Sequence, residues 1–130
     1  MSYLGIDFGK KKIGIAIAPE GILAVGYSIV YNDKSLIENL ANIISSNEIG
    51  VIVVGLPISM SGKKSASTDL TLEFIEKIEK IFPNQKIFSY DERMTSQEAR
   101  KNLPSQKFDD IEAARIILQG FLDKQKNLKL

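Results

Sequence analysis

The sequence contains neither cysteine nor histidine. The first absence excludes disulfide bonds, cysteine nucleophiles and cysteine-based zinc sites, and the second excludes Ser-His-Asp triads, HExxH zinc sites and histidine-based hydrolytic mechanisms. Any hydrolytic chemistry must therefore use Asp, Glu, Lys, Tyr or Ser. Carboxylates combined with hard cations such as magnesium or manganese are the natural remaining choice.

The chain also lacks long apolar runs and a charge excess of either sign. Its uninterrupted apolar stretches are short, and its N-terminus has neither the apolar block nor the cleavage site of a signal peptide. We therefore expect a cytoplasmic protein that does not cross a membrane. The 17 basic and 16 acidic residues give a net charge of +1, so that only local charge can argue for a nucleic-acid partner.

Length and composition are typical of one compact domain. The 130 residues include 44% hydrophobic and 25% charged side chains, a balance that supports a hydrophobic core. We expect a single domain over residues 1–130, with a frayed, lysine-bearing tail from about residue 124.

Hydrophobic patterning predicts both strands and amphipathic helices. Ser35 with Glu38, and Thr95 with Glu98, fit the capping boxes that open helices. The expected strands are 3–8, 13–18, 22–31, 51–54 and 86–90, and the expected helices are 35–45, 69–82, 95–102 and one that opens at residues 109–110.

The order of these elements predicts an α/β fold. Three strands in antiparallel sequence followed by alternating helices and strands, βββαβαβα in outline, indicate a mixed five-stranded sheet with helices packed on its faces. Ligands of such sheets bind beyond the carboxyl ends of the parallel strands. Polar residues at those ends are therefore the candidates for a functional site.

Acidic residues stand at the ends of three predicted elements. Asp7 interrupts an apolar strand, where a buried charge needs a cation or hydrogen-bond donors, although it could instead organise the following turn. Glu92 follows the last strand, in a charged segment that could equally be a solvated loop. Asp109 and Asp110 open the last helix, where Asp is a preferred N-cap, so that one can cap while the other faces the site.

The convergence of these carboxylates matters more than any one of them. They would repel one another strongly unless cations lay between them. Two divalent ions about 3.5–4 Å apart stabilise the attacking and leaving oxygens in phosphodiester cleavage. Asp7, one of Asp91 and Glu92, and one of Asp109 and Asp110 are therefore candidate metal-binding catalytic residues.

Basic side chains stand next to the same positions and could contact phosphates. A run of three lysines in a hairpin turn is, however, more often just a solvated turn. The basic residues are Lys10, Lys11 and Lys12 after Asp7, Lys63 and Lys64 in a glycine-containing segment, and Arg93 beside Glu92.

Four motifs, in order along essentially the whole chain, resemble the YqgF/RuvX family. The second and third are fairly specific at this spacing, whereas the first is weak alone. They are Gly5-Ile-Asp-Phe-Gly9 with Lys11 and Lys12, Val54-Gly-Leu-Pro57, Asp91-Glu-Arg-Met-Thr95, and Asp110 ahead of Ala113-Ala114-Arg-Ile-Ile-Leu-Gln119.

The resemblance implies an RNase H-like fold and a nuclease that acts on nucleic acid. Relatives are described as Holliday junction resolvases and as nucleases that mature the precursor of small-subunit ribosomal RNA, so the expected partner is pre-rRNA or structured DNA. Carried over by position, the catalytic metal ligands are Asp7, Glu92 and Asp110, with Mg²⁺ or Mn²⁺ as the cofactor and two ions as the expected number. Asp110 is preferred to Asp109 because it stands three residues before the Ala-Ala pair.

The substrate-binding residues implied by the same motifs are Lys11, Lys12, Arg93 and Thr95. This chain departs from the family pattern at Lys10, where Thr or Ser is expected, and at Lys12, where Arg is expected. The second departure replaces a planar bidentate donor by a point charge, which affects how substrate is gripped.

Two other functions remain open from the sequence. An ATP site of the actin or sugar-kinase type also begins with a strand bearing Asp-x-Gly, but its cleft needs two large lobes that 130 residues do not supply. A non-catalytic nucleic-acid-binding module would keep the same carboxylates for structure. The sequence leaves the choice between monomer and homodimer undecided.

Overall fold

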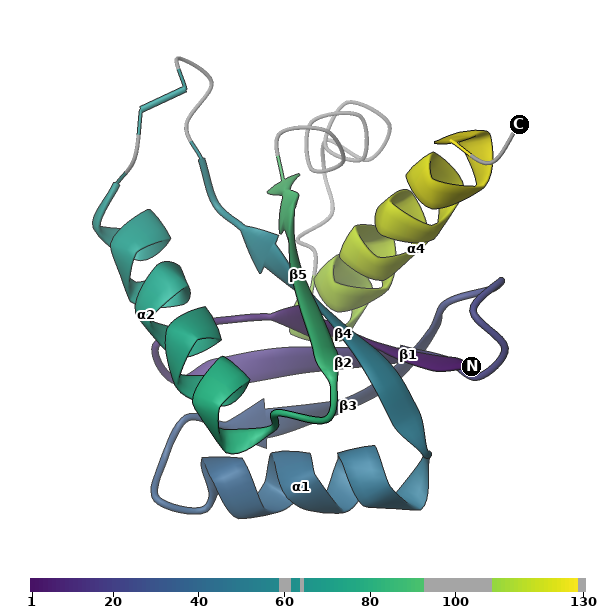
Figure 1. The fold of residues 1–130 in the computed structure, drawn as a ribbon. Helices are drawn as coiled ribbons and strands as arrows, with labels where there is room; N and C mark the ends of the chain where they lie inside the picture. Colours follow the sequence, from purple (N-terminus) through teal and green to yellow (C-terminus); the bar gives the residue numbers. More distant parts are fainter. Residues whose placement is uncertain (59–61, 64, 93–108, 129–130) are drawn as a thin grey trace.

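The computed structural model of the chain describes residues 1–58, 62–63, 65–92 and 109–128 (Figure 1). Their elements, in chain order, are β1 (Ser2–Asp7), β2 (Lys12–Ala18), β3 (Val25–Tyr31), α1 (Leu36–Ser46), β4 (Ile49–Leu56), α2 (Ala66–Ile81), β5 (Lys86–Asp91) and α4 (Asp110–Leu128). The expected helix 95–102 lies outside the described residues.

The strands form one mixed five-stranded sheet in the order β3-β2-β1-β4-β5. β1, β4 and β5 are parallel neighbours, whereas β2 runs antiparallel to β1 and to β3. The expected mixed α/β sheet is therefore confirmed. Because β1, β4 and β5 are parallel, their carboxyl ends meet at one edge of the sheet, where Asp7 ends β1 and Asp91 ends β5.

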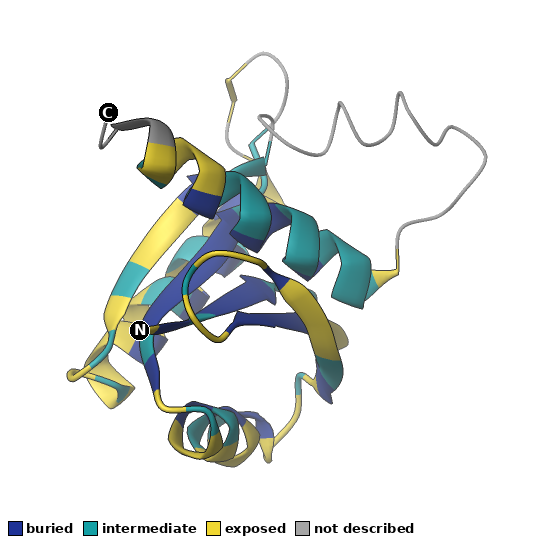
Figure 2. Cartoon of the chain, turned by 90° about the vertical axis from the view of Figure 1, so that its right-hand side faces the viewer, coloured by how far each residue is buried: buried dark blue, intermediate teal, exposed yellow. Residues whose placement is uncertain are grey.

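The helices cover both faces of the sheet (Figure 1). One core cluster joins the sheet to α1 and α2, and a second joins the opposite face to α4. Leu4 and Ile6 of β1 belong to the first cluster, while Tyr3 packs with the second. Since neighbouring strand residues point to opposite faces, this alternation directs Asp7 toward α4. Figure 2 shows the buried strands enclosed between these layers.

Helix α4 lies directly on the sheet because glycines leave it room. Gly14 of β2 stands opposite Asp7 in the antiparallel pair, and a Cβ added to Gly14 would overlap the carbonyl oxygen of Asp110. Gly55 of β4 similarly accepts the end of the Ile117 side chain. The lack of side chains at these strand positions therefore fixes where α4 begins.

Two helix starts differ from the sequence expectation. Helix α2 begins at Ala66, not 69, because Ser65 and Thr68 form the capping box there. At α1, Ser35 makes no side-chain capping bond, so the box expected with Glu38 does not form. The Asp33 carboxylate instead accepts a hydrogen bond from the backbone N–H of Ser35, at 2.8 Å.

Two other boundaries also differ from the expected ones. Strand β3 begins at Val25, not 22, because Gly21 turns the chain with a φ of 73° and the Gln119 side chain on α4 accepts from the N–H of Ala24 at 2.8 Å. Helix α4 continues through Leu128, beyond the point near residue 124 at which the tail was expected to fray. None of the helices in the described ranges has the length and apolar character needed to cross a membrane.

We expect Gly14→Ala to lower the free energy of unfolding by about 1–3 kcal/mol or more, because the new methyl group must displace the backbone of α4. Gly50→Ala is the matched control: it lies in β4, and its Cβ would meet only the flexible Met1 side chain, at 3.1 Å or more. Urea unfolding measures both variants. Equal midpoints for the two would show that close packing at Gly14 does not limit stability.

Candidate functional site

The carboxylate of Asp7 stands at the centre of the candidate site. Asp7 is the last residue of β1, the middle strand of the sheet, and its side chain is partly buried. Gly14 on β2 faces it in the ladder, and β4 flanks β1 on the other side. The sheet therefore fixes the Asp7 backbone from both sides.

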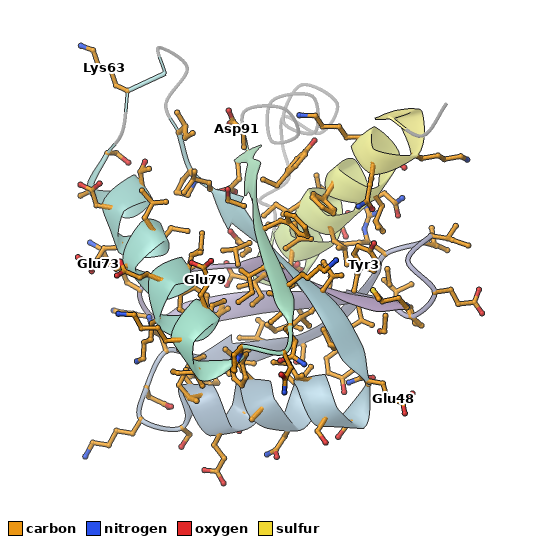
Figure 3. The ribbon with its side chains drawn as sticks, viewed as in Figure 1. Tyr3, Glu48, Lys63, Glu73, Glu79 and Asp91 are labelled. Atoms are coloured by element: carbon orange, nitrogen blue, oxygen red, sulfur yellow. The ribbon has the colours of Figure 1, made fainter. Side chains whose placement is uncertain are left out.

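Glu92 reaches the same region from the end of β5. The register pairs Gly55 with Tyr90 and Leu56 with Asp91, so that Glu92 follows at the carboxyl end of the sheet. A Cβ added to Gly55 would lie 3.2 Å from the Glu92 carboxyl carbon. The Glu92 carboxyl group thus packs over a strand position that carries no side chain. Figure 3 shows neighbouring Asp91 at this end of β5.

The two aspartates that open α4 have different roles. The Asp109 carboxylate accepts a hydrogen bond from the Glu112 N–H at 2.7 Å, the geometry of an N-cap. The Asp110 backbone rests against Gly14, opposite Asp7. Capping by Asp109 therefore leaves Asp110 as the aspartate next to Asp7.

The pKa of Asp7 reflects how closely these carboxylates approach it. Burial, followed by the negative charges of Glu92 and Asp110, raises the pKa of Asp7 to about 7. Burial removes water from the carboxylate, and like charges oppose its ionisation. The three predicted acidic residues therefore lie close enough to act on one another.

A pocket of about 190 Å³ adjoins the carboxylates. Asp7, Glu92 and Lys10 line it, together with residues from the first turns of α2. α2 is held there because the Thr68 hydroxyl donates a hydrogen bond to the carbonyl of Pro57 in the segment after β4. The site therefore has a polar, acidic wall on the sheet and a second wall on α2.

The lysine turn between β1 and β2 borders this pocket. The Asn32 side-chain amide donates to the Gly9 carbonyl at 3.0 Å, and the Asn32 backbone N–H donates to the Lys11 carbonyl at 2.9 Å. Lys11 and Lys12 are exposed beside the site. Asn32, just after β3, thus fixes the backbone of the turn on both sides of Lys10.

Among the other predicted basic residues, Lys63 lies in the described part of the chain. Lys63 lies in the segment between β4 and α2, and its side chain points away from the sheet (Figure 3). Arg93, Thr95 and Lys64, which the sequence also predicted to contact or support substrate, lie outside the described residues.

The acidic residues fit an open metal site better than a closed one. Across the described ranges, no three Asp, Glu, His or Cys side chains are spaced to hold one ion together. The donors that converge are nevertheless hard carboxylate oxygens with crowded negative charge. Mg²⁺ typically binds one or two carboxylates and completes its shell with water and substrate phosphate oxygens. A site built from Asp7 with Glu92 or Asp110 matches that requirement.

Three contributors to the site were not predicted from the sequence. Gly14 interrupts an otherwise apolar, mostly β-branched strand, a signal for close backbone approach. Lys10 was named among the basic residues that could contact phosphates, but nothing in the sequence separated it from Lys11 and Lys12. Asn32 gave no signal, because its contacts with Gly9 and Lys11 join segments that are distant in sequence.

The pKa of Asp7 predicts how stability changes with pH when chelator removes metal. The folded protein keeps the Asp7 proton up to about pH 7, whereas the unfolded chain loses it near the ordinary pKa of 3.8. Between these values the unfolded state binds fewer protons, so the free energy of unfolding falls as pH rises. A difference of one pKa unit between the folded and unfolded states corresponds to about 1.4 kcal/mol.

We therefore expect Asp7→Asn to flatten this decline between pH 4 and 7 and to unfold at higher urea than the wild type at pH 8. Glu79→Gln, which removes an exposed carboxylate from α2, should follow the wild-type curve. Parallel curves for wild type and Asp7→Asn would contradict the buried, crowded environment of Asp7.

The chain has clear relatives among known proteins. A family model described as "RuvX: Holliday junction resolvase" matches residues 1–124. A "Putative pre-16S rRNA nuclease" from Sulfurihydrogenibium sp. (strain YO3AOP1) is 34% identical over 130 residues, covering 93% of this chain and 89% of the relative. A protein of the same name from Thermoanaerobacter pseudethanolicus is 35% identical over 140 residues, covering 98% and 99%.

Structural comparison shows that solved structures share the fold of this chain. The structure titled "T. thermophilus RuvC in complex with Holliday junction substrate" matches with a TM-score of 0.62 and 10% identity, covering 97% of this chain and 96% of that one. At this identity the likeness concerns the fold, and it confirms the expected RNase H-like architecture. Because the family model spans nearly the whole sequence and relatives above 30% identity align over most of their length, this chain belongs to the RuvX family.

Proposed function

We propose that this protein is a divalent-metal-dependent nuclease that hydrolyses phosphodiester bonds in nucleic acid. The observation that carries the proposal is the approach of Glu92 and Asp110 to the partly buried Asp7, at the carboxyl end of the sheet. Burial, followed by their negative charge, raises the pKa of Asp7. Carboxylates crowded beside an open pocket suit a cation and a phosphate better than they suit an isolated protein core.

In this proposal the chain's own residues bind the metal ions and the nucleic acid. Asp7, Glu92 and Asp110 supply the metal ligands, and Asp7 is the most constrained because it stands in the central strand. Lys11, Lys12, Arg93 and Thr95 contact or support the nucleic acid. Mg²⁺ or Mn²⁺, bound as two ions, would supply Lewis-acid polarisation of the phosphodiester and activate the attacking water.

The favoured substrate is the 5′ end of pre-16S ribosomal RNA, cut by one cytoplasmic nuclease domain. The names of the two relatives support this choice. A four-way DNA junction is the second candidate, since the family model and the matched RuvC structure carry that substrate in their descriptions. A non-catalytic nucleic-acid-binding module is the third interpretation of the same site.

We expect cleavage that requires Mg²⁺ or Mn²⁺, stops in chelator, and falls by more than about 100-fold in Asp7→Asn, since loss of residues that merely support metal ligands already costs about 10–100-fold. The assay uses end-labelled single-stranded RNA, precursor 16S ribosomal RNA and a four-way DNA junction. Cleavage products on a denaturing gel rank the substrates.

Glu79→Gln is the matched control, because it removes one exposed negative charge from the outer part of α2. Its cleavage rate should equal that of the wild type. An active Asp7→Asn variant would remove Asp7 from the metal site, and binding without cleavage in every metal would favour the binding module.

A further inference from the structure

We propose that Lys10 binds a backbone phosphate of the nucleic acid beside the carboxylate pocket, and that Asn32 is the positioning residue that holds Lys10 there. The inference rests on the proposed function. It assigns a role to one of the three lysines in the turn between β1 and β2.

The position of Lys10 separates it from the other lysines of the turn. Lys10 lines the same pocket as Asp7 and Glu92, and it is the only cationic residue among those that line it in the described part of the chain. It is exposed, and it forms no ion pair within the described ranges. An ammonium group at this rim is therefore available to an incoming anion.

Hydrogen bonds hold the backbone of the turn that carries Lys10. Asn32 accounts for two hydrogen bonds, one to the carbonyl of Gly9 and one to the carbonyl of Lys11, which flank Lys10 in the chain. Gly9 is also packed so tightly that an added Cβ would overlap the carbonyl oxygen of Lys12. Because the backbone is already ordered, binding loses less conformational entropy than it would from a loose loop.

The charge of the pocket explains why a cation is needed at this place. Asp7 and Glu92 supply negative charge at the pocket wall, and this charge repels the phosphodiester that must approach it. A lysine at the rim offsets the repulsion and adds one phosphate contact, and it does so without the fixed fork geometry of arginine. The solvated-turn interpretation explains exposure, but it gives no reason for the bond from the Asn32 side chain to the Gly9 carbonyl.

Binding is measured first, in chelator, where no cleavage occurs. The probe is a fluorescent single-stranded RNA oligonucleotide, titrated by anisotropy at several salt concentrations. Lys10→Gln should weaken binding about 3- to 10-fold, as expected for one charged contact. It should also reduce the slope of log K against log salt by about 0.7, the value for one phosphate of a single strand.

Lys86→Gln is the matched control, because it removes one exposed lysine at the opposite edge of the sheet, where β5 begins. Asn32→Ala should weaken binding in the wild-type background and have little further effect in Lys10→Gln. A purely structural role of Asn32 would instead add its full effect to that of Lys10→Gln.

Cleavage with Mg²⁺ separates this inference from the proposed function. If the wild type cuts but Lys10→Gln matches Lys86→Gln in affinity, salt slope and kcat/KM, the role of Lys10 is overturned and the nuclease stands. If the wild type binds without cutting and Lys10→Gln still lowers the affinity and the salt slope, the phosphate-binding role of Lys10 is supported and the nuclease activity is not. A wild type that does not bind the RNA at all overturns both.

Discussion

The approach of helix α4 to the bare backbone of the central strands is the constraint on which the rest of the site depends. Gly14 and Gly55 lie on the two strands that flank β1, and neither carries a side chain that would hold its neighbours away. The first makes room for the start of α4 and therefore for Asp110. The second makes room for the carboxyl group of Glu92. Both approaches converge on the end of β1, so the same two absences of a side chain bring two further carboxylates, Glu92 and Asp110, to Asp7.

That assembly has an electrostatic cost that the surrounding core must offset. Asp7 loses hydration and gains two negatively charged neighbours, and its pKa rises to about 7 as a result. A proton relieves this repulsion at low pH, and in the proposed nuclease a divalent ion would relieve it at neutral pH. Residues that are unfavourable for folding and are nevertheless held in place by a rigid sheet are typical of functional sites. The braced lysine turn supplies positive charge at the rim of the same pocket, where it can meet a phosphate without neutralising the carboxylates themselves.

Local sequence patterns were sufficient to predict the strands and helices, but not the residues at which they begin and end. Alternating and helical apolar spacing located all five strands and the helices α1, α2 and α4. The start of β3 was misplaced because a distant contact decides it: Gln119 on α4 binds the chain just before β3. The start of α2 was misplaced because Ser65 pairs with Thr68, three residues later, and starts the helix earlier than the apolar pattern indicates. The capping box expected at Ser35 failed because Asp33, two residues earlier, satisfies the backbone N–H of Ser35.

The sequence by itself determined the chemistry that this protein can use. Without cysteine or histidine, any hydrolytic site had to use Asp, Glu, Lys, Tyr or Ser, and carboxylates were the natural choice. The order of strands and helices directed Asp7, Glu92 and Asp110 toward the carboxyl edge of a mixed sheet. Only the tertiary structure decided that Asp109 caps α4 while Asp110 faces Asp7. It also decided that Lys10, and not Lys11 or Lys12, lines the pocket. The reason is physical: residue type and periodicity fix which groups are charged and which faces are apolar, whereas the distance between two charges depends on how closely separate elements pack.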